Sequence, residues 1–496
     1  MLRAEQPVDK PICTLRKRKI AKNTANSTGR SAGQLLNPPS HLRHFLGRND
    51  LTPIRYPATV DGGQRNKQYT PTLQITCVYT GFGASHIFAS LRAINLSRLI
   101  SNPTALSLIP LQLDEEKPLE RSSTVQMIEA LLVLNTGSSS LKFQVFEGHD
   151  LSVLMSGKIT GIGDTPEMRT NLPGGEEVAR TLPADTDHDS ALRSVIDLID
   201  GHDHDWHTIA VVHRVVHGGQ DFKAPVIVTA DVLRRLESLI PLAPLHQPHN
   251  LAGIAASARL ASGATDIACF DTAFHAGHDE LTSSFALPQD LRDKGMRRYG
   301  FHGLSYEWIS EVLSRDHPEI HAGRVVVGHL GNGASLCALR NGVSIDTTMS
   351  MTALDGITMG TRSGAIDPGA VLYMLQELGL SVEAVQDTLY ERSGLKGLSG
   401  ISNDVATLLR SDDPRAAFAL DYFALKAAQH AAMMAVSMGG IDAFVFTGGI
   451  GEHAAPIRDA ILQRLRFLGD FKTLVIPTNE ERVMAVHARA LLQGVG

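Results

Sequence analysis

"LLVLNTGSSSLKFQVFE" spans residues 131–147 and decides the fold. Apolar residues flank a short polar turn on both sides, which predicts two strands joined by a hairpin. The turn holds Asn135, Gly137 and three serines, and Lys142 follows on the second strand. Glycine permits close backbone approach, and amides, hydroxyls and a lysine are groups that bind phosphate. The stretch therefore predicts a phosphate-binding turn, although an ordinary hairpin with a solvated lysine has the same composition.

A second stretch, "LGNGASLCALRNG" (330–342), repeats this pattern about 190 residues downstream. Both stretches run Leu, Asn and Gly within a few residues, then Ser-Leu, alternating strand residues and Gly. Self-similarity at this distance predicts two related domains rather than a short solenoid repeat. A third glycine element, "TGGIGEH" (447–453), follows an apolar strand and could hold a nucleotide at a helix start. The chain lacks GxxxxGK[ST], which excludes a P-loop protein.

Length and composition indicate an ordinary globular protein. The chain has 496 residues, 43% hydrophobic and 20% charged, which suggests two to four domains at about 100–200 residues each. The net charge of −6 argues against a nucleic-acid partner, and no apolar run reaches the ~18 residues of a transmembrane helix. The four cysteines form no CxxC pair, so we expect neither a disulfide framework nor a cysteine zinc site. This fits a cytoplasmic protein.

The first 126 residues differ from the rest in charge. They hold 17 Lys and Arg against 8 Asp and Glu, a net of +9, which leaves −15 for the remainder. A basic, acid-poor start can be an organelle transit peptide or a nucleic-acid arm. The interpretation that composition favours is a disordered leader, or upstream sequence translated from a start codon placed too early. Met127 stands four residues before the first convincing strand.

From residue 128 onward, apolar strands mix with helical patterns, which predicts an α/β protein. Strands are expected within 208–219, 266–275, 324–339 and 441–453, and helices over 232–244, 250–263, 368–379 and 421–440. Three charged residues stand out. Arg214 lies among valines, and a buried arginine needs an anionic partner. Asp271 follows an apolar strand, and active-site residues of α/β proteins are often found at the ends of strands. A role as the N-cap of a helix is the alternative. Arg362 in "MGTRSG" is typical of an anion-binding loop or of a turn.

Ten motifs occur in one order along the chain. They are "LNTGSSSLKFQVF", "HRVVHGG", "APLHQPHN", "FDTAFH", "RRYGFHGLS", "GHLGNGASLCALRNGVSIDTTM", "MGTRSG", "SGLKGLSGISND", "FTGGIGEH" and "PTNEE". Over roughly 128–490 the sequence resembles the acetate kinase family, of the acetate and sugar kinase, Hsp70 and actin superfamily. The resemblance implies an α/β fold of two duplicated ribonuclease H-like (actin-type) domains around a nucleotide cleft, usually in a homodimer. We expect a leader over 1–126, a first domain over 127–275 that can receive the C-terminal helix, and a second over 276–496. Family members begin near the first strand, which makes Met127 the expected start.

The resemblance also implies an activity and its residues. ATP and acetate would exchange a phosphoryl group reversibly, giving ADP and acetyl phosphate, with Mg²⁺ (or Mn²⁺) as cofactor. The implied catalytic residues are Asp271, His302 and Arg362, and the implied metal contacts are Asn135 and Glu480. The substrate would contact Arg214, Val216, Leu245, His246, Phe301 and Ala353. ATP would contact Ser138, Ser140, Lys142, His329, Leu330, Gly331, Asn332, Gly333, Asp404, Val405, Ala406, Gly449, Ile450, Gly451, Glu452 and His453.

Within this scheme Arg214 would hold the carboxylate, and Arg362 and His302 would stabilise the phosphoryl oxygens in transfer. The family assigns proton transfer to the residue that Asp271 matches. Because a carboxylate substrate is already ionised at pH 7, we interpret Asp271 as a residue that orients Arg214 or a metal-bound water.

The sequence departs from the family pattern at several positions. Ala406 stands where an arginine is common, His453 replaces Asn, and Ala365, Leu304 and Tyr306 also differ. Ala353 replaces a proline, which gives the acid pocket room for about one methylene. A kinase of propionate, butyrate or a sugar therefore stays open beside acetate, although Arg214 favours a carboxylate over a sugar. A non-catalytic nucleotide-binding relative is the third interpretation, and the intact charged residues argue against it.

Overall fold

The computed structural model describes residues 12–14, 76–78, 127–137, 139–172, 174–201, 206–261 and 263–494. The chain divides into two compact units, Met1–Ser122 and Ser123–Gly496. In the first unit β1 (Ile12–Thr14) pairs antiparallel with β2 (Thr76–Val78). Apart from β1 and β2, the residues of the expected leader lie outside the described ones, and so does the expected ATP contact Ser138.

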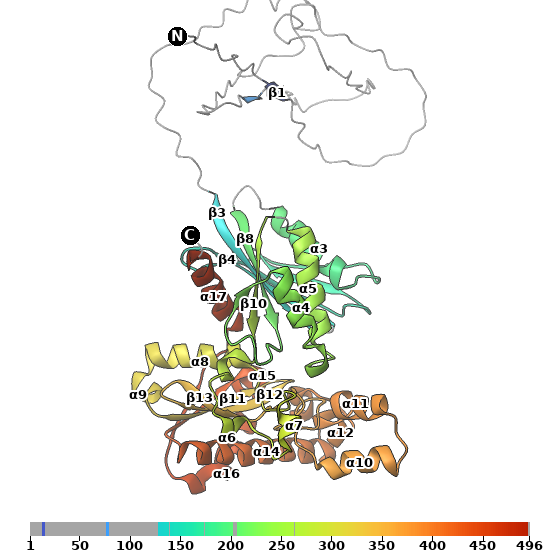
Figure 1. The fold of residues 1–496 in the computed structure, drawn as a ribbon, viewed down its shortest axis with the longest axis vertical. Coiled ribbons are helices and arrows are strands. Elements are labelled where there is room, and N and C mark those ends of the chain that lie inside the picture. The colour runs from blue at the N-terminus through green and yellow to red at the C-terminus, as the bar shows by residue number, and fades with distance from the viewer. Residues whose placement is uncertain are drawn as a thin grey trace, which may run out of the picture. The chain divides into compact units, whose positions relative to one another are not determined.

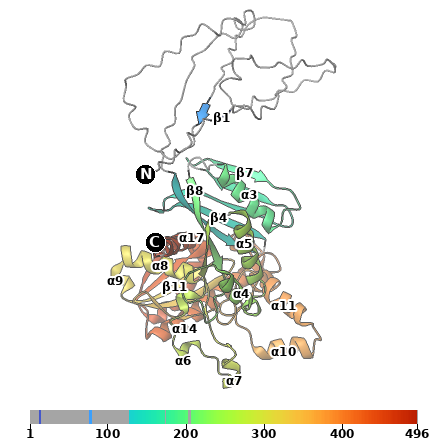
Figure 2. The ribbon, with the colours of Figure 1, turned by 45° about the horizontal axis from the view of Figure 1, so that its top comes forward.

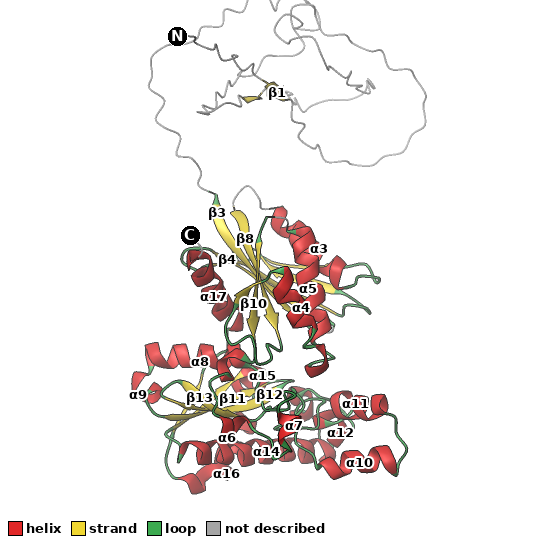
Figure 3. Cartoon of the chain, in the orientation of Figure 1, coloured by secondary structure: helices red, strands yellow, loops and turns green. Residues whose placement is uncertain are grey.

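The second unit contains two mixed sheets (Figures 1 and 3). The first sheet is built from β3 (Ile128–Thr136), β4 (Ser140–Glu147), β5 (Val153–Thr160), β6 (Glu167–Asn171), β7 (Glu177–Thr181), β8 (Trp206–Val215), β9 (Val226–Ile227) and β10 (Thr265–Phe270). The second is built from β11 (Arg324–Leu330), β12 (Ala334–Arg340), β13 (Val343–Thr347), β14 (Ala443–Thr447) and β15 (Lys472–Val475).

The two sheets share one topology. Their orders are β7-β6-β5-β4-β3-β8-β10-β9 and β13-β12-β11-β14-β15. In the first, β3 pairs antiparallel with β4 and parallel with β8; in the second, β11 pairs antiparallel with β12 and parallel with β14. The five strands β5-β4-β3-β8-β10 therefore repeat as β13-β12-β11-β14-β15. This repeat confirms the duplicated actin-type fold predicted from the echo between the two hairpins.

Helices connect the strands of the second unit. They are α3 (His188–Asp200), α4 (Ala230–Glu237), η2 (Ile240–Leu242), α5 (Gln247–Leu260), η3 (Ala273–His275), α6 (Glu280–Ser283), α7 (Gln289–Arg292), α8 (Gly303–Asp316) and α9 (Pro318–His321). Further along come α10 (Pro368–Gln376), α11 (Val382–Glu391), α12 (Gly394–Ser399), α13 (Val405–Leu409), α14 (Pro414–Met438), α15 (Gly448–His453), α16 (Ala455–Leu465), η4 (Arg466–Leu468) and α17 (Glu480–Gly494).

The helix α14 shows how the sequence sets an element. Asp413 accepts a hydrogen bond from the N–H of Arg415, and Pro414 stands at the first helical position, as a helix start requires. Gly439 ends the helix at φ 75°, in the left-handed region that glycine tolerates. Small side chains at helical spacing are buried between these ends, so α14 packs closely against β12.

Helices cover both faces of each sheet. On the first sheet, apolar residues of α3 share a cluster with one face, and Val483, Met484, Ala485 and Ala488 of α17 pack on the other face. Figure 1 shows α3 and α5 on one side of this sheet and α17 on the other. On the second sheet, α14 and α16 cover one face and α8 the other. Figure 2 shows α8 and α17 side by side, so the C-terminal helix packs on the first sheet next to a helix of the second half.

The domain boundaries at residues 126 and 275 stay predictions. Across the described residues, no helix has both the length and the apolar composition needed to cross a bilayer.

Candidate active site

A cavity of about 730 Å³ gathers residues from both halves of the second unit. Its walls come from β4, β8, the start of α8, the β11–β12 turn, the loop before α10, and the starts of α13, α15 and α17. Most of the residues expected from the sequence line it: Lys142, Arg214, His302, His329, Gly331, Asn332, Gly333, Arg362, Asp404, Val405, Ala406, Gly449, Ile450, His453 and Glu480. The volume lies in the range of ligand pockets.

Arg214 lies at the end of β8 between two carboxylates. Its Nε and Nη2 donate to both oxygens of Asp271 at 2.8 and 2.7 Å, and its Nη1 donates to Glu480 Oε2 at 2.7 Å. Asp271 is 2% exposed and Glu480 7%. Burial lowers the pKa of Arg214, but the two carboxylates outweigh burial and raise it above its ordinary value. Burial raises the pKa of Asp271, and Arg214 opposes that rise. Asp271 thus contacts the guanidinium with both of its oxygens, and its orienting role stays a prediction.

Arg362 is a partly buried cation without a carboxylate partner in the described part of the chain. Its Nη1 donates to the carbonyl of Ala353 at 3.0 Å, and its Nη2 lies 3.5 Å from His246 Nε2. Burial lowers the pKa of the guanidinium. Burial, reinforced by Arg362 and then Arg214, also lowers the pKa of His246 to about 4, so its Nε2 accepts from Arg362 as a neutral ring. An uncompensated cation at a cavity wall selects for an anionic ligand.

Two imidazoles stack beside the β11–β12 turn. The rings of His302 and His329 lie 4.3 Å apart between centroids. Burial is the main cause of the lowered pKa of both groups, His302 far below its ordinary value and His329 to about 4, and nearby cations add to it. His302 precedes α8 with φ 57°, a left-handed conformation that is strained for a residue with a Cβ and is often found at functional sites. Both rings are neutral at pH 7.

The glycine turns bring backbone close to the cavity. The N–H of Gly331 donates to Gly333 at 3.1 Å, and the carbonyl of Asn332 accepts from Gly360 at 3.0 Å. A Cβ on Gly360 would overlap the Oδ1 of Asn332, so a larger residue at this position would displace that side chain. The Asn332 Oδ1 also accepts from Asn403 at 3.0 Å. These contacts tie the turn to the loop that carries Arg362 and to the segment before Asp404.

Glu452 and Ser140 are expected ATP contacts that do not line the cavity. Glu452 Oε1 accepts from the backbone N–H of Gly448 at 3.0 Å and of Thr478 at 3.1 Å, which links the start of α15 to the loop before α17. Ser140 begins β4, and its carbonyl accepts from Gly137 at 2.8 Å. The structure does not bring Leu330 and Gly451 to the cavity: Leu330 is fully buried in the core, and Gly451 is buried inside α15.

Three of the residues expected to form the acid pocket lie together in one apolar cluster. Phe301 belongs to a buried core cluster, and Val216 and Ala353 pack against the same cluster. The backbone N–H of Val216 donates to Asn250 Oδ1 at 3.0 Å, and Asn250 in turn donates to the carbonyl of Thr136 at 3.1 Å. Leu245 is half-buried and lies outside this cluster.

The described residues contain no group of three or more His, Cys, Asp or Glu side chains that could hold a metal ion. The two expected contacts still suit Mg²⁺, which needs only one or two protein oxygens beside phosphates and waters. Glu480 lines the cavity and commits only one carboxylate oxygen to Arg214. Asn135 is half-buried at the end of β3, opposite Lys142 of β4.

Several residues of the site were missed by the sequence reasoning. Thr478 and Glu481 line the cavity on either side of Glu480. Both belong to the quoted motif "PTNEE", so their position in the sequence was the available signal. Ser305 and Ser335 contact the two imidazoles, with Oγ atoms 2.8 Å from Nδ1 of His329 and of His302. A lone serine in a helix or strand gives no such signal.

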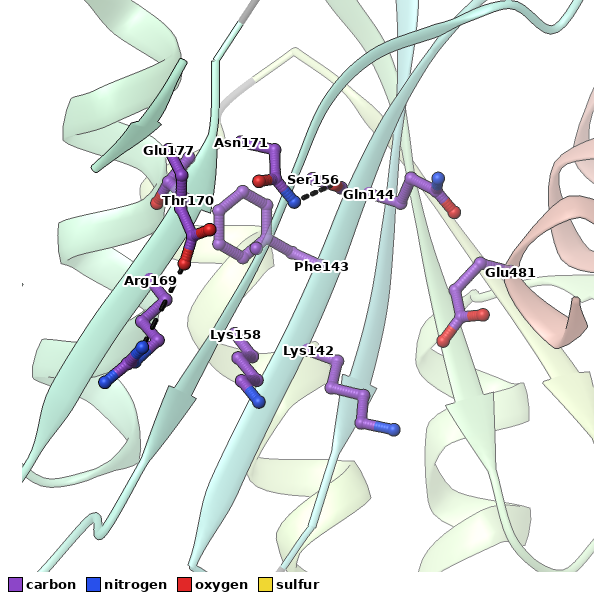
Figure 4. A pocket seen from close by; sticks show the side chains of 11 residues that line it. Lys142, Phe143, Gln144, Ser156, Lys158, Arg169, Thr170, Asn171, Glu177 and Glu481 are labelled. Atoms are coloured by element: carbon purple, nitrogen blue, oxygen red, sulfur yellow. Dashed lines mark hydrogen bonds and ion pairs between the residues drawn. The ribbon is translucent and has the colours of Figure 1, made fainter. Parts of the chain in front are cut away.

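A second hollow of about 380 Å³ adjoins Lys142 on the face of β4, β5 and β6 (Figure 4). Lys142 stands opposite Lys158, and Lys158 opposite Arg169, so three cations form one row across the strands. Arg169 lies 4.0 Å from Glu177, and Glu481 lines the hollow near Lys142. The mixture of charges does not distinguish this hollow from an ordinary solvated sheet face.

Two duplicated actin-type domains and a cavity of glycine turns and buried cations define the class, a phosphotransferase built on this fold. Within that class the chain belongs to the acetokinase family, whose family model matches residues 130–473.

Individual relatives agree with this assignment. The acetate kinase of Nitrobacter hamburgensis is 44% identical over 392 residues, covering 74% of this chain and 96% of that protein. The crystal structure of a propionate kinase from Francisella tularensis is similar at a TM-score of 0.69 and 34% identity, covering 73% of this chain and 99% of that one. The crystal structure of Porphyromonas gingivalis acetate kinase gives a TM-score of 0.65 and 32% identity, over 73% of this chain and 100% of that one.

Proposed function

We propose that the protein is an acetate kinase, which transfers a phosphoryl group reversibly between ATP and acetate to give ADP and acetyl phosphate. The observation that carries this proposal is the pair of arginines at one cavity. Arg214 is preset by two carboxylates, whereas Arg362 has no carboxylate partner among the described residues. One cation can hold a carboxylate and the other remains for a phosphoryl group. Family membership and the similarity to acetate kinases support the same reaction.

Arg214 has the geometry to bind the acid. A guanidinium carries five N–H groups, and three of them are directed at Asp271 and Glu480. One N–H on Nη1 and one on Nη2 remain, which suits two oxygens of a carboxylate. The substrate is already ionised and needs no general base. Asp271 therefore acts by holding Arg214 in place.

In the transfer, an oxygen of acetate forms a bond to the γ-phosphorus while the bond to the β,γ-bridging oxygen breaks and ADP leaves. The transition state of such transfers is loose, so positioning and charge stabilisation supply most of the catalysis. Arg362 and His302 are the donors for the equatorial oxygens. Lys142 and the glycine turns hold the remaining phosphates, and Asp404, Val405, Ala406 and the start of α15 lie along the nucleoside end.

We propose Asn135 and Glu480 as the protein contacts of Mg²⁺. When bound with ATP, the ion neutralises charge on the phosphates. Glu480 also accepts a hydrogen bond from Arg214. One residue would therefore position both the arginine that binds the acid and the metal ion that binds the nucleotide.

A direct test incubates the protein with ATP, Mg²⁺ and a panel of acids and traps acyl phosphates with hydroxylamine. We expect the highest kcat/KM with acetate. Propionate is the second candidate, because a similar solved structure is a propionate kinase. In addition Ala353, whose carbonyl accepts from Arg362, lacks the ring of the proline that the family pattern has at this position. Higher kcat/KM with propionate or butyrate would shift the assignment to that acid. Phosphorylation of a sugar, or no transfer at all, would overturn it.

We also propose a homodimer. Residues 366–382 around α10 expose a group of large apolar side chains: Ile366 (43%), Leu372 (52%), Tyr373 (57%), Leu378 (57%) and Val382 (65%). None of the residues of α10 is buried. Several large apolar side chains exposed within one short segment are typical of a protein interface. The cytoplasmic location inferred from the cysteines stays a prediction.

A further inference from the structure

A serine and a tyrosine lie behind His302, out of reach of the cavity. The Oγ of Ser335 is 2.8 Å from His302 Nδ1 and 2.5 Å from the hydroxyl of Tyr306. Ser335 on β12 and Tyr306 on α8 are both 0% exposed. The three groups form one chain of hydrogen bonds that runs from the protein interior to the cavity wall.

The direction of this chain follows from counting protons. The tyrosine hydroxyl has one proton, and a buried hydroxyl needs an acceptor for it. Ser335 is the side chain that the structure places within hydrogen-bond distance of that hydroxyl among the described residues. Tyr306 therefore donates to Ser335, and the proton of Ser335 is directed at the remaining neighbour, His302 Nδ1. Nδ1 is then an acceptor, and the neutral ring carries its proton on Nε2.

The Nε2 atom of His302 faces the β11–β12 turn. A Cβ built on Gly333 would lie 3.4 Å from it, so Nε2 is next to the β11–β12 turn at the cavity wall. Burial together with His329, Arg214, Arg362 and His275 lowers the pKa of His302 and keeps the ring neutral. A neutral N–H at this place is a hydrogen-bond donor that faces the cavity.

We propose that Tyr306 and Ser335 are positioning residues that hold His302 as the Nε2–H tautomer, so that it donates to the phosphoryl group in transfer. This role rests on the proposed kinase function. The neighbouring imidazole provides a comparison. The Nδ1 of His329 contacts Ser305, whose Oγ is 3.0 Å from the Thr478 hydroxyl, and either hydroxyl can donate in that pair. Thr478 lines the cavity, where its proton can be donated to a ligand or water, whereas Tyr306 is fully buried. Of the two chains, the one that ends in the tyrosine therefore has a fixed direction.

The test is ¹⁵N NMR of the full-length protein with labelled histidines, together with steady-state kinetics. His302→Gln identifies the His302 signals by difference. In the wild type we expect His302 to show a protonated Nε2 and an unprotonated Nδ1. In Tyr306→Phe the signals should move toward a mixture of tautomers, kcat should fall about tenfold, and the KM values for ATP and acetate should stay within about twofold.

Ser305→Ala is the matched control, because it removes a serine from the other imidazole and should leave the His302 signals unchanged. Ser335→Ala should reproduce the effect of Tyr306→Phe and decides the matter if that variant does not fold. A wild-type His302 protonated on Nδ1, or an unchanged tautomer in the folded variants, would overturn the proposal. The NMR comparison needs no turnover, so absence of acyl phosphate would count against the kinase function alone.

Discussion

Arg214 is a buried cation that pairs with two buried carboxylates, Asp271 and Glu480. The loss of any one of these three groups should therefore destabilise the site. Removing one partner of such a group leaves an uncompensated charge and typically costs about 3–5 kcal/mol. Two carboxylates depend on Arg214, and Asp271 makes both of its oxygens available to it. We therefore expect Arg214 to contribute to stability in addition to the substrate binding proposed for it.

Arg214→Met should lower the free energy of unfolding more at pH 8 than at pH 5. Without the cation the pKa of Asp271 rises further above its unfolded value. A carboxyl group whose pKa is higher in the folded state stabilises the fold while it is protonated, and this stabilisation is lost as the pH rises through the pKa of folded Asp271. The variant is therefore less stable at pH 8 than at pH 5. Urea unfolding at the two pH values measures this. Arg324→Met is the control, since the Arg324–Asp442 pair is more than a third exposed and should matter little at either pH. Equal losses at both pH values would contradict the prediction.

Ala353→Pro should widen the ratio of kcat/KM for acetate over propionate by several fold. The proline ring fills the space of about one methylene, worth ~0.8 kcal/mol when buried. The substitution keeps the carbonyl that accepts from Arg362, and the N–H of Ala353 donates to no acceptor among the described residues. Ala353→Gly, which enlarges the space, should move the ratio the other way. If proline leaves the ratio unchanged or narrows it, Ala353 does not line the acid pocket.

At the scale of elements, the β11–β12 turn is held in place by the glycine loop beside it. Gly360→Ala should force Asn332 away from Asn403 and so move the turn. We expect KM for ATP to rise about tenfold, the loss of roughly one hydrogen bond, while KM for acetate changes little. Gly277→Ala is the control, because a Cβ there has no heavy atom within 4 Å. If KM for ATP is the same in both variants, the β11–β12 turn does not take part in nucleotide binding.

The elements show what the sequence could and could not predict. Strand and turn signals placed both hairpins correctly, because alternation and glycine act locally. The helix predicted over 421–440 in fact begins at Pro414, where an aspartate cap and a proline start it earlier. The hydrogen bonds of Ser335 depend on α8 packing over β12, which no local pattern encodes. The packing of α17 on the first sheet is a long-range contact, which the family resemblance suggested and local pattern did not.

At the scale of the whole molecule, the apolar surface around α10 predicts self-association. Tyr373→Asp should convert a dimer into a monomer in sedimentation velocity, because it places a charge in the centre of an apolar contact. Val343→Asp is the control: Val343 is equally exposed, at 58%, but lies on β13. A wild-type monomer at micromolar concentration, or a dimer in the Tyr373 variant, would exclude this surface as the interface.

The chain divides into two compact units, and we expect the second unit to fold and act without the first. The family model begins at residue 130, and 74% of this chain matches 96% of the length of the Nitrobacter hamburgensis acetate kinase. All residues of the candidate site lie in the unit Ser123–Gly496. A chain that begins at Met127 should therefore fold with the same melting temperature and the same kcat/KM for ATP and acetate as the full chain. Both chains are compared by thermal unfolding and by the hydroxylamine assay. Failure of the shorter chain to fold, or a loss of kcat/KM above about tenfold, would show that residues 1–126 take part in folding or catalysis.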